Sequence, residues 1–263
     1  MIQEILRPRT VPEAVRARSR VGAAYLGGGT WLNSLRSDEL TTLISLENLG
    51  LGAIETARGR CVIGATANLQ QIVDAQSAPP ALRAAASLTS ARPVRNMKTI
   101  GGELGQCAPD SALIPVLIAL KADVTLAGQK KPCPVEQFCE ERPAGLILSV
   151  SVPVLPCAVK TVSRTSHSPR SLVAAASFRE CRPALADVRV VVSDCRGQRV
   201  RLRDVERALE GQPLAEKSQV EELVRAAFTP EADMHASSAY KRYVCGVLVA
   251  DALHALESAK DAP

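Results

Sequence analysis

Two glycine-rich segments are the parts of the sequence whose residue types point most directly to ligand chemistry. The first, Gly27-Gly28-Gly29-Thr30, follows the short apolar run Ala23–Leu26. Consecutive glycines allow positive φ and let the backbone approach a ligand closely, because no Cβ stands in the way. Successive N–H groups in such a turn can form an anion-binding nest, and the Thr30 hydroxyl adds a donor. The segment matches neither G-x-G-x-x-G nor a P-loop, so it predicts either a phosphate loop or a tight turn that ends a strand.

The second segment contains two adjacent glycines in the order Thr99-Ile100-Gly101-Gly102. Adjacent glycines again indicate that the backbone approaches something closely. The surrounding residues 95–110 are rich in turn-forming types and predict an irregular loop. Two glycine loops in one chain could hold a dinucleotide from two sides, with the amides of both loops facing its diphosphate.

Single side chains near these segments could also do chemistry. Trp31 could stack on an adenine or a flavin edge, although a residue packed at an interface is the favoured interpretation. Glu103 and Asp110 lack a partner histidine, which argues against a general acid–base pair. Cys107 could have a redox role, but a buried neutral thiol is the favoured alternative. No side chain is therefore assigned as catalytic.

Composition narrows the class of protein. The chain has 263 residues, 32 of them basic and 27 acidic, and 46% are hydrophobic. The basic residues are scattered, so a nucleic-acid partner is not supported. The cysteines and histidines lack the spacing of a zinc or iron–sulfur site, with His167 expected in a surface loop and His235 at a helix entry. No signal-peptide pattern and no run of about 18 apolar residues occurs, so we expect a cytoplasmic protein without a membrane span, its thiols reduced and mostly buried.

Apolar runs and helix signals predict the elements that position these segments. Strands are expected at 23–26, 43–46, 61–65 and 123–127, then at 145–152 and 158–163 around a proline-marked turn, and as a second pair at 172–178 and 186–192. Helices are expected at 12–19 after the N-cap Thr10, at 67–75 after the N-cap Thr66, at 79–88, at 111–122 with Pro115 in the first turn or at a kink, and at 204–209, 218–228 and 238–257. The pattern changes from α/β to α+β within 153–171, where we expect a domain junction.

Three motifs, taken in order, carry a resemblance to a known family. The first is 27–30, which is similar to an A-G-G-T loop. The second is 95–102, RNMKTIGG, and it is followed by a proline-containing helix. The third is 233–242, DMHASSAYKR, which is similar to D-x-R-x-S-x-x-Y-R. The chain thus resembles the FAD-binding subunit of molybdenum hydroxylases, such as the flavin domain of xanthine dehydrogenase and the medium subunit of carbon monoxide dehydrogenase. Within this family the chain most resembles an uncharacterised bacterial branch, which also has Glu after the two glycines, as Glu103 is here.

The resemblance implies an α+β protein with a two-subdomain FAD-binding fold of the vanillyl-alcohol-oxidase (PCMH) type. An α+β C-terminal domain, an antiparallel sheet with helices, would follow. The implied FAD-binding domain is 1–160, with subdomains of about 1–55 and 56–160, and the C-terminal flavoprotein domain is 161–263.

The resemblance also implies a function. The chain would be an oxidoreductase flavoprotein subunit, xanthine dehydrogenase-like, whose FAD takes electrons from a [2Fe–2S] subunit and passes them to NAD or a quinone. The substrate would be hydroxylated on a molybdopterin subunit. The implied FAD-binding residues are Leu26, Gly27, Gly28, Gly29, Thr30, Trp31, Thr99, Ile100, Gly101, Gly102, Glu103, Ser111 and Lys160.

Two departures from the family pattern bear on cofactor binding. Glu103 stands where Asn is usual, and a carboxylate about 4 Å from a diphosphate charge costs about 1–4 kcal/mol. Ala112 stands where xanthine dehydrogenase-like members have an acid near the flavin ring. FAD binding could therefore be weakened, and the alternative function is a degenerate flavin-domain scaffold without redox-active FAD.

Overall fold

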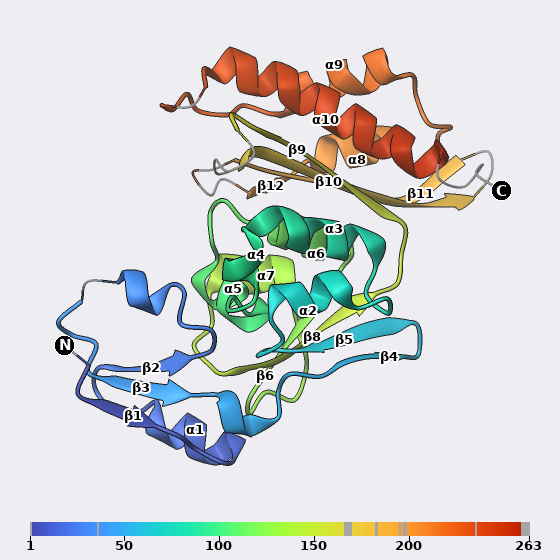
Figure 1. Ribbon diagram of the computed structural model, residues 1–263. Coiled ribbons are helices and arrows are strands. Elements are labelled where there is room, and N and C mark those ends of the chain that lie inside the picture. Colours follow the sequence, from blue (N-terminus) through green and yellow to red (C-terminus); the bar gives the residue numbers. More distant parts are fainter. Residues whose placement is uncertain are drawn as a thin grey trace. The chain divides into compact units, whose positions relative to one another are not determined.

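The structure is a computed structural model that describes residues 2–35, 37–165, 170–181, 184–194, 196, 199–234 and 236–258 (Figure 1). His167 and His235 lie outside these residues, so their predicted places are not described. The chain forms two units, each assembled from several segments. The first consists of Met1–Ala78, Ser90–Cys107 and Lys121–Pro153, and the second of Pro79–Thr89, Ala108–Leu120 and Val154–Pro263.

The first unit contains a small parallel sheet at the N-terminal end of the chain. Its order is β1 (Glu4–Leu6), β3 (Thr42–Ser45) and β2 (Ala23–Leu26). Every residue of β3, the central strand, is buried, including the polar Thr42 and Ser45. Helix α1 (Val11–Ala17) begins at Thr10, whose hydroxyl accepts a hydrogen bond from the Glu13 amide, so the predicted N-cap is confirmed. Ala14 of this helix packs with Ala23 and Ile44 in one apolar cluster.

A second sheet of the first unit is antiparallel and has the strand order β4-β5-β8-β6-β7. These strands are β4 (Ile54–Ala57), β5 (Arg60–Gly64), β8 (Ile147–Pro153), β6 (Asp123–Leu126) and β7 (Cys133–Pro134). The helices of this unit are α1, α2 (Leu69–Asp74), α4 (Arg92–Arg95), α5 (Ile100–Gln106) and α7 (Val135–Glu141), with the short 3-10 turns η1 (Leu32–Ser34) and η2 (Glu47–Leu49).

Two expectations about this unit are wrong. The stretch 95–110 is not an irregular loop, because α5 occupies much of it, with Ile100 and Leu104 buried and the Thr99 side chain capping its first turn. Helix α2 begins at Asn68 rather than at Thr66. The Asn68 side chain accepts from the Gln71 amide, and the Gln71 side chain accepts from the Asn68 amide. This reciprocal capping box satisfies two N–H groups at once and so fixes the helix start.

The second unit is built on a four-stranded antiparallel sheet of order β12-β11-β10-β9. The strands are β9 (Cys157–Ser163), β10 (Arg170–Cys181), β11 (Ala184–Asp194) and β12 (Arg199–Arg201), and the helices are α3 (Pro80–Thr89), α6 (Leu113–Ala119), α8 (Arg203–Leu209), α9 (Lys217–Ala227) and α10 (Ser238–Ser258). The predicted pairing of 172–178 with 186–192 is confirmed. The strands predicted at 145–152 and 158–163 exist, but they belong to different sheets.

Both faces of the β10 strand are covered, which explains the apolar run 172–176 within it. Leu172, Ala174 and Ala176 belong to a core cluster that includes residues of α8, α9 and α10. The alternate residues point to the opposite face, where the Ser177 hydroxyl donates to the Ala119 carbonyl at the end of α6, 2.7 Å away. Figure 1 shows α10 and α9 on one side of this sheet and α6 on the other.

No helix within the described ranges is long and apolar enough to cross a membrane.

A buried lysine fixes the start of α10. Lys241 is 0% exposed, and its Nζ donates to Asp233 Oδ2 at 2.5 Å, to the Glu231 carbonyl at 3.0 Å and to Asp194 Oδ2 at 3.1 Å. Burial lowers the pKa of this ammonium, but the bonds from Asp233 and Asp194 outweigh burial and raise the pKa above its usual value. The ion cluster therefore ties the first turn of α10 to the end of β11.

We expect Lys241→Met to lower the free energy of unfolding by about 3–5 kcal/mol, because it removes the buried ammonium that pairs with Asp194 and Asp233. Lys217→Met is the matched control, since Lys217 pairs with Asp251 at a largely exposed site, and it should stay within about 1 kcal/mol of wild type. Denaturant unfolding of both variants measures the difference. A raised pKa in the folded state keeps this stabilisation fully present at neutral pH and loses it only as the pH rises through that value. Equal stability of the two variants would show that the cluster is not stabilising.

Candidate cofactor site

A cavity of about 530 Å³ in the first unit contains most of the glycines singled out in the sequence. Its size is typical of small-molecule and cofactor sites. Its walls come from the end of β2, the segment 27–32, the segment 98–106 and the segment 138–147. The two glycine-rich segments, which are far apart along the chain, thus share one cavity.

The first glycine segment offers free backbone donors to this cavity. Gly27, Gly28, Gly29 and Thr30 directly follow β2 and all line the cavity. Gly29 has φ of +71°, a conformation that favours glycine. Among the described residues, the amide N–H groups of these four residues have no hydrogen-bond acceptor. Successive unpaired N–H groups at a turn form an anion-binding concavity, which is the chemistry expected from the sequence.

The two segments touch each other where glycine removes a side chain. A Cβ added to Gly28 would lie 1.5 Å from the carbonyl oxygen of Met97 and 3.3 Å from the amide nitrogen of Lys98. A Cβ added to Gly27 would lie 2.9 Å from the Thr99 hydroxyl. No side chain fits at Gly28 unless the two backbones move apart. Glycine is therefore needed here for contact within the protein.

The second glycine segment acts differently from the expectation. The amides of Ile100 and Gly101 donate to the carbonyls of Ala67 and Ala65. The Gly102 amide donates to the Thr99 hydroxyl at 3.1 Å, so it too is bonded inside the protein. The expectation that the amides of both segments face a diphosphate is wrong for the second segment. Gly101 instead makes room for the Ala65 carbonyl, which would lie 2.7 Å from a Cβ at Gly101.

The charge of the cavity wall is one-sided. Arg18, Lys98 and Arg142 line the cavity, and no Asp or Glu is among the described residues that do so. Arg18 and Arg142 follow the last residues of α1 and α7. Burial raises the pKa of the neighbouring Tyr25, an effect that Arg18 partly offsets. A concave wall with three cations and four free amides suits a ligand with two negative charges.

Glu103, the expected source of repulsion, does not line the cavity. Its side chain is 0% exposed in the first turn of α5, and Lys98 Nζ lies 2.7 Å from its Oε2. Neither carboxylate oxygen accepts a hydrogen bond of normal geometry, so the ion pair is the compensation that the structure gives this carboxylate. The positive charge of Lys98 therefore offsets the negative charge of Glu103 near the cavity.

The other predicted residues are divided between the two units. In the first unit, Leu26 ends β2 and Ile100 is buried. Trp31 lines the cavity and is 43% exposed, so its side chain is open to a ligand or to an interface partner, and both interpretations stay predictions. The remaining two residues belong to the second unit: the buried Ser111 hydroxyl accepts from the Leu113 and Ile114 amides, and Lys160 lies on β9.

The three basic residues of the cavity wall were not predicted from the sequence. Nothing around Arg18 and Arg142 indicates ligand binding, because each simply follows the last residue of a short helix. One feature of the sequence could have indicated Lys98. This basic residue stands shortly before the glycine pair 101–102, and the acidic residue Glu103 stands directly after that pair.

Thiol chemistry is not indicated by the described cysteines. Cys61, Cys107 and Cys245 are buried, while Cys133, Cys139 and Cys157 are half-buried, so the expectation of mostly buried thiols holds for half of them. Burial raises the pKa of Cys245 to about 12, which keeps this thiol protonated at neutral pH. No cluster of metal-ligating side chains occurs within the described ranges.

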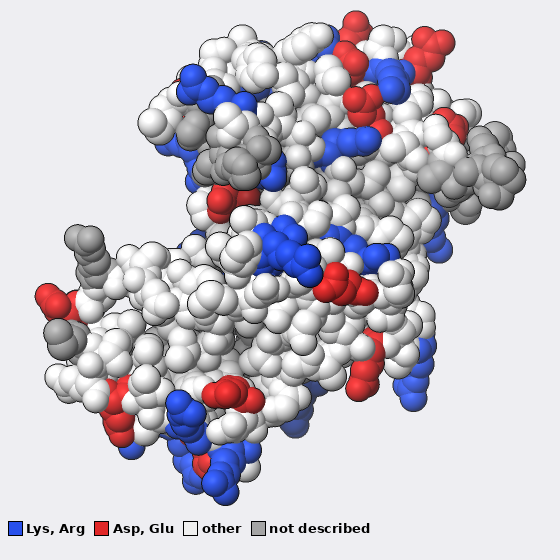
Figure 2. Space-filling view, viewed as in Figure 1, with Lys and Arg blue, Asp and Glu red and all other residues white. Residues whose placement is uncertain are grey.

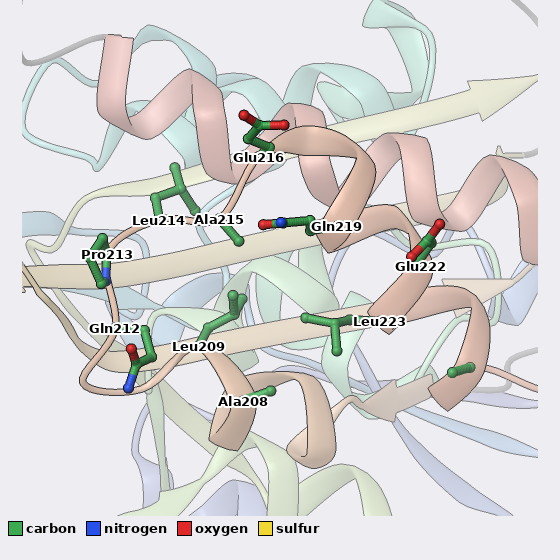
Figure 3. A pocket seen from close by; sticks show the side chains of 11 residues that line it. Ala208, Leu209, Gln212, Pro213, Leu214, Ala215, Glu216, Gln219, Glu222 and Leu223 are labelled. Atoms are coloured by element: carbon green, nitrogen blue, oxygen red, sulfur yellow. The ribbon is translucent and has the colours of Figure 1, made fainter.

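A second cavity, of about 780 Å³, lies in the second unit between α8 and α9 (Figure 3). Glu216 and Glu222 are its charged residues, and no Lys or Arg is among the described residues that line it. This groove therefore does not suit an anionic ligand. Figure 2 shows basic and acidic side chains interspersed on the face in view, without a large area of one sign among the described residues.

Family models cover both parts of the chain. Residues 1–155 match the FAD binding domain in molybdopterin dehydrogenase, and residues 159–256 match the CO dehydrogenase flavoprotein C-terminal domain. The chain is thus a flavoprotein component of an oxidoreductase, with FAD as its cofactor. The chain belongs to the FAD-binding subunits of the molybdenum hydroxylase family. The family resemblance, the fold class and the cofactor expected from the sequence are confirmed.

Individual proteins share the sequence or the fold of this chain. The chain is 34% identical to the uncharacterized protein YgfM of Escherichia coli strain K12, with 95% of each chain covered. It shares the fold of a carbon monoxide dehydrogenase chain from Hydrogenophaga pseudoflava, with a TM-score of 0.86, 23% identity and 98% of each chain covered. A chain of quinoline 2-oxidoreductase from Pseudomonas putida 86 also has a TM-score of 0.86, at 17% identity and 98% coverage of each chain.

We expect Gly28→Ala to lower the free energy of unfolding by about 1–3 kcal/mol or more, because its Cβ would overlap the Met97 carbonyl. Gly105→Ala is the matched control. Gly105 lies in α5 and lines the same cavity, and a Cβ there meets no atom within 4 Å. This control should be neutral or more stable by up to about 1 kcal/mol. Denaturant unfolding compares the two, and a Gly28→Ala protein as stable as Gly105→Ala would contradict the close contact.

Proposed function

We propose that this chain is the FAD-carrying electron-transfer subunit of a molybdenum-hydroxylase-type oxidoreductase. Bound FAD would accept electrons from a [2Fe–2S] partner subunit and pass them to an acceptor such as NAD or a quinone. A separate molybdopterin subunit would oxidise the organic substrate. The observation that carries this proposal is the cavity wall, where the described residues supply three cations, no carboxylate and four amides that have no acceptor among them.

The first unit supplies groups suited to each part of the cofactor. We assign the amides of Gly27 to Thr30 to the diphosphate, which carries two negative charges. Trp31, half-exposed at the cavity wall, would stack on an aromatic ring of the cofactor. The second glycine pair, Gly101 and Gly102, lines the same cavity and would lie beside the cofactor. These residues bind and orient the cofactor, and none of them moves a proton.

The finer features of this proposal rest on the family. We propose the site residues named in the sequence analysis, including Leu26, Thr99, Ile100, Ser111 and Lys160, and a division into domains 1–160 and 161–263. A xanthine dehydrogenase-like activity, a cytoplasmic location and the partner subunits have the same support. The carbon monoxide dehydrogenase and quinoline 2-oxidoreductase relatives are oxidoreductases by name, which favours this class of activity.

The alternative, a scaffold subunit without redox-active FAD, loses part of its motivation. It depended on Glu103 facing a phosphate and on Ala112 replacing an acid. Glu103 is buried and paired with Lys98, so it is not a bare negative charge in the cavity. Ala112 remains as the departure that favours this alternative.

We expect the purified protein to carry the flavin absorption bands or to take up added FAD with quenching of its fluorescence. Replacing both Arg18 and Arg142 by Gln should weaken FAD binding at least about tenfold, because two of the three positive charges of the wall are lost. Arg207→Gln, an exposed change in α8, is the control and should bind as wild type does. A colourless protein that refuses FAD at high concentration, yet assembles with its partner subunits, would support the scaffold alternative instead.

A further inference from the structure

Lys98 is the one basic residue of the cavity wall whose backbone adjoins the free amides of the first glycine segment. Its amide nitrogen lies 3.3 Å from the position of a Cβ on Gly28. The Lys98 amide donates to the Val94 carbonyl, and the Lys98 carbonyl accepts from the Leu69 amide, both at 2.8 Å. These bonds fix the backbone from which the lysine side chain starts. The Lys98 side chain therefore starts beside Gly28, next to the segment whose four N–H groups have no acceptor among the described residues.

The side chain of Lys98 connects the cavity to a buried carboxylate. Lys98 lines the cavity with 15% of its side chain exposed, whereas Glu103 is completely buried. Lys98 Nζ lies 2.7 Å from Glu103 Oε2, an ion pair without a hydrogen bond of normal geometry. Among the described residues, Glu103 is the partner that the structure gives to Lys98 Nζ. The N–H donors of the ammonium group therefore stay available to a ligand in the cavity.

Among the described residues, the ion pair with Lys98 is the contact that offsets the burial of the Glu103 charge. Its two oxygens accept no hydrogen bond of normal geometry, and an uncompensated carboxylate is strongly disfavoured in a protein interior. A carboxylate behind a lysine restricts the ammonium group to one place. It also reduces the attraction of that ammonium for an anion, since the pair has no net charge.

We propose that Lys98 binds the diphosphate of the cofactor and that Glu103 is a positioning residue that holds the Lys98 ammonium at the cavity wall. This inference rests on the proposed function, since it assumes that FAD occupies this cavity. It adds a charged side-chain contact to the backbone amides of Gly27 to Thr30. Glu103, the residue after the two glycines, would then influence FAD affinity through the position of the Lys98 ammonium.

The experiment compares variants that differ by the charge of Lys98 alone. Lys98→Met by itself leaves Glu103 buried and unpaired, so that variant could fail to fold. Glu103→Gln keeps an acceptor for the Lys98 ammonium and removes the negative charge. The double variant Lys98→Met/Glu103→Gln removes both charges together. Lys217→Met, far along the chain at a largely exposed pair, controls for a general effect of losing a lysine.

We expect Glu103→Gln to bind FAD at least as tightly as wild type, and the double variant to bind at least about tenfold more weakly than Glu103→Gln, as for the loss of one charge-assisted hydrogen bond. Fluorescence quenching measures FAD affinity. Competition by ADP, which has the diphosphate but no flavin, should weaken to the same extent. Riboflavin, which has no phosphate, should bind both variants equally.

Three outcomes overturn the inference, and they are distinguishable from failure of the proposed function. Equal FAD affinity of Glu103→Gln and the double variant would show that Lys98 makes no contact with the diphosphate. An equal loss of riboflavin and FAD affinity would show that Lys98 only maintains the cavity. A large loss of FAD affinity in Glu103→Gln would show that the carboxylate itself is required. If wild-type protein takes up no FAD at all, the proposed function fails and this inference fails with it.

Discussion

The site depends on one steric constraint, the contact between the backbone at Gly28 and the carbonyl of Met97. A methyl group at Gly28 would come within 1.5 Å of that oxygen, so the two segments can meet only because no side chain stands between them. Their contact places the unpaired amides of 27–30 and the start of the Lys98 side chain at one wall. Through this contact, two separate features of the sequence form one wall whose N–H groups and lysine suit an anion.

Elements with a strong pattern could be predicted from the sequence, and those defined by tertiary contacts could not. The long helix α10 and the apolar strand β10 are specified by their own residues. Helix α5 begins with an adjacent glycine pair, which locally favours a loop. It forms because the Thr99 hydroxyl caps it and because Ile100 and Leu104 are buried. The missed strands β1, β4, β7 and β12 have two to four residues each, too few to show a period.

The same division holds for the site. The glycine segments and Trp31 are visible in the sequence, because glycine pairs and a single tryptophan are unusual residue choices. The cations Arg18 and Arg142 look like surface residues until the fold brings their helix ends to the cavity. Glu103 was expected near phosphate because the sequence does not show which way α5 turns. The helix directs this carboxylate into the protein interior, where Lys98 meets it.

The segmented make-up of the two units has a consequence for biosynthesis. All seven residues of α6 are buried, and this helix packs on strands β10 and β11, which follow it in the chain. The ribosome completes α6 well before Ser177 exists to bond its last carbonyl. At typical elongation rates this delay is on the order of 3–10 seconds. During that interval a nascent polypeptide exposes a strongly apolar helix, so a chaperone that shields such surfaces would reduce its aggregation.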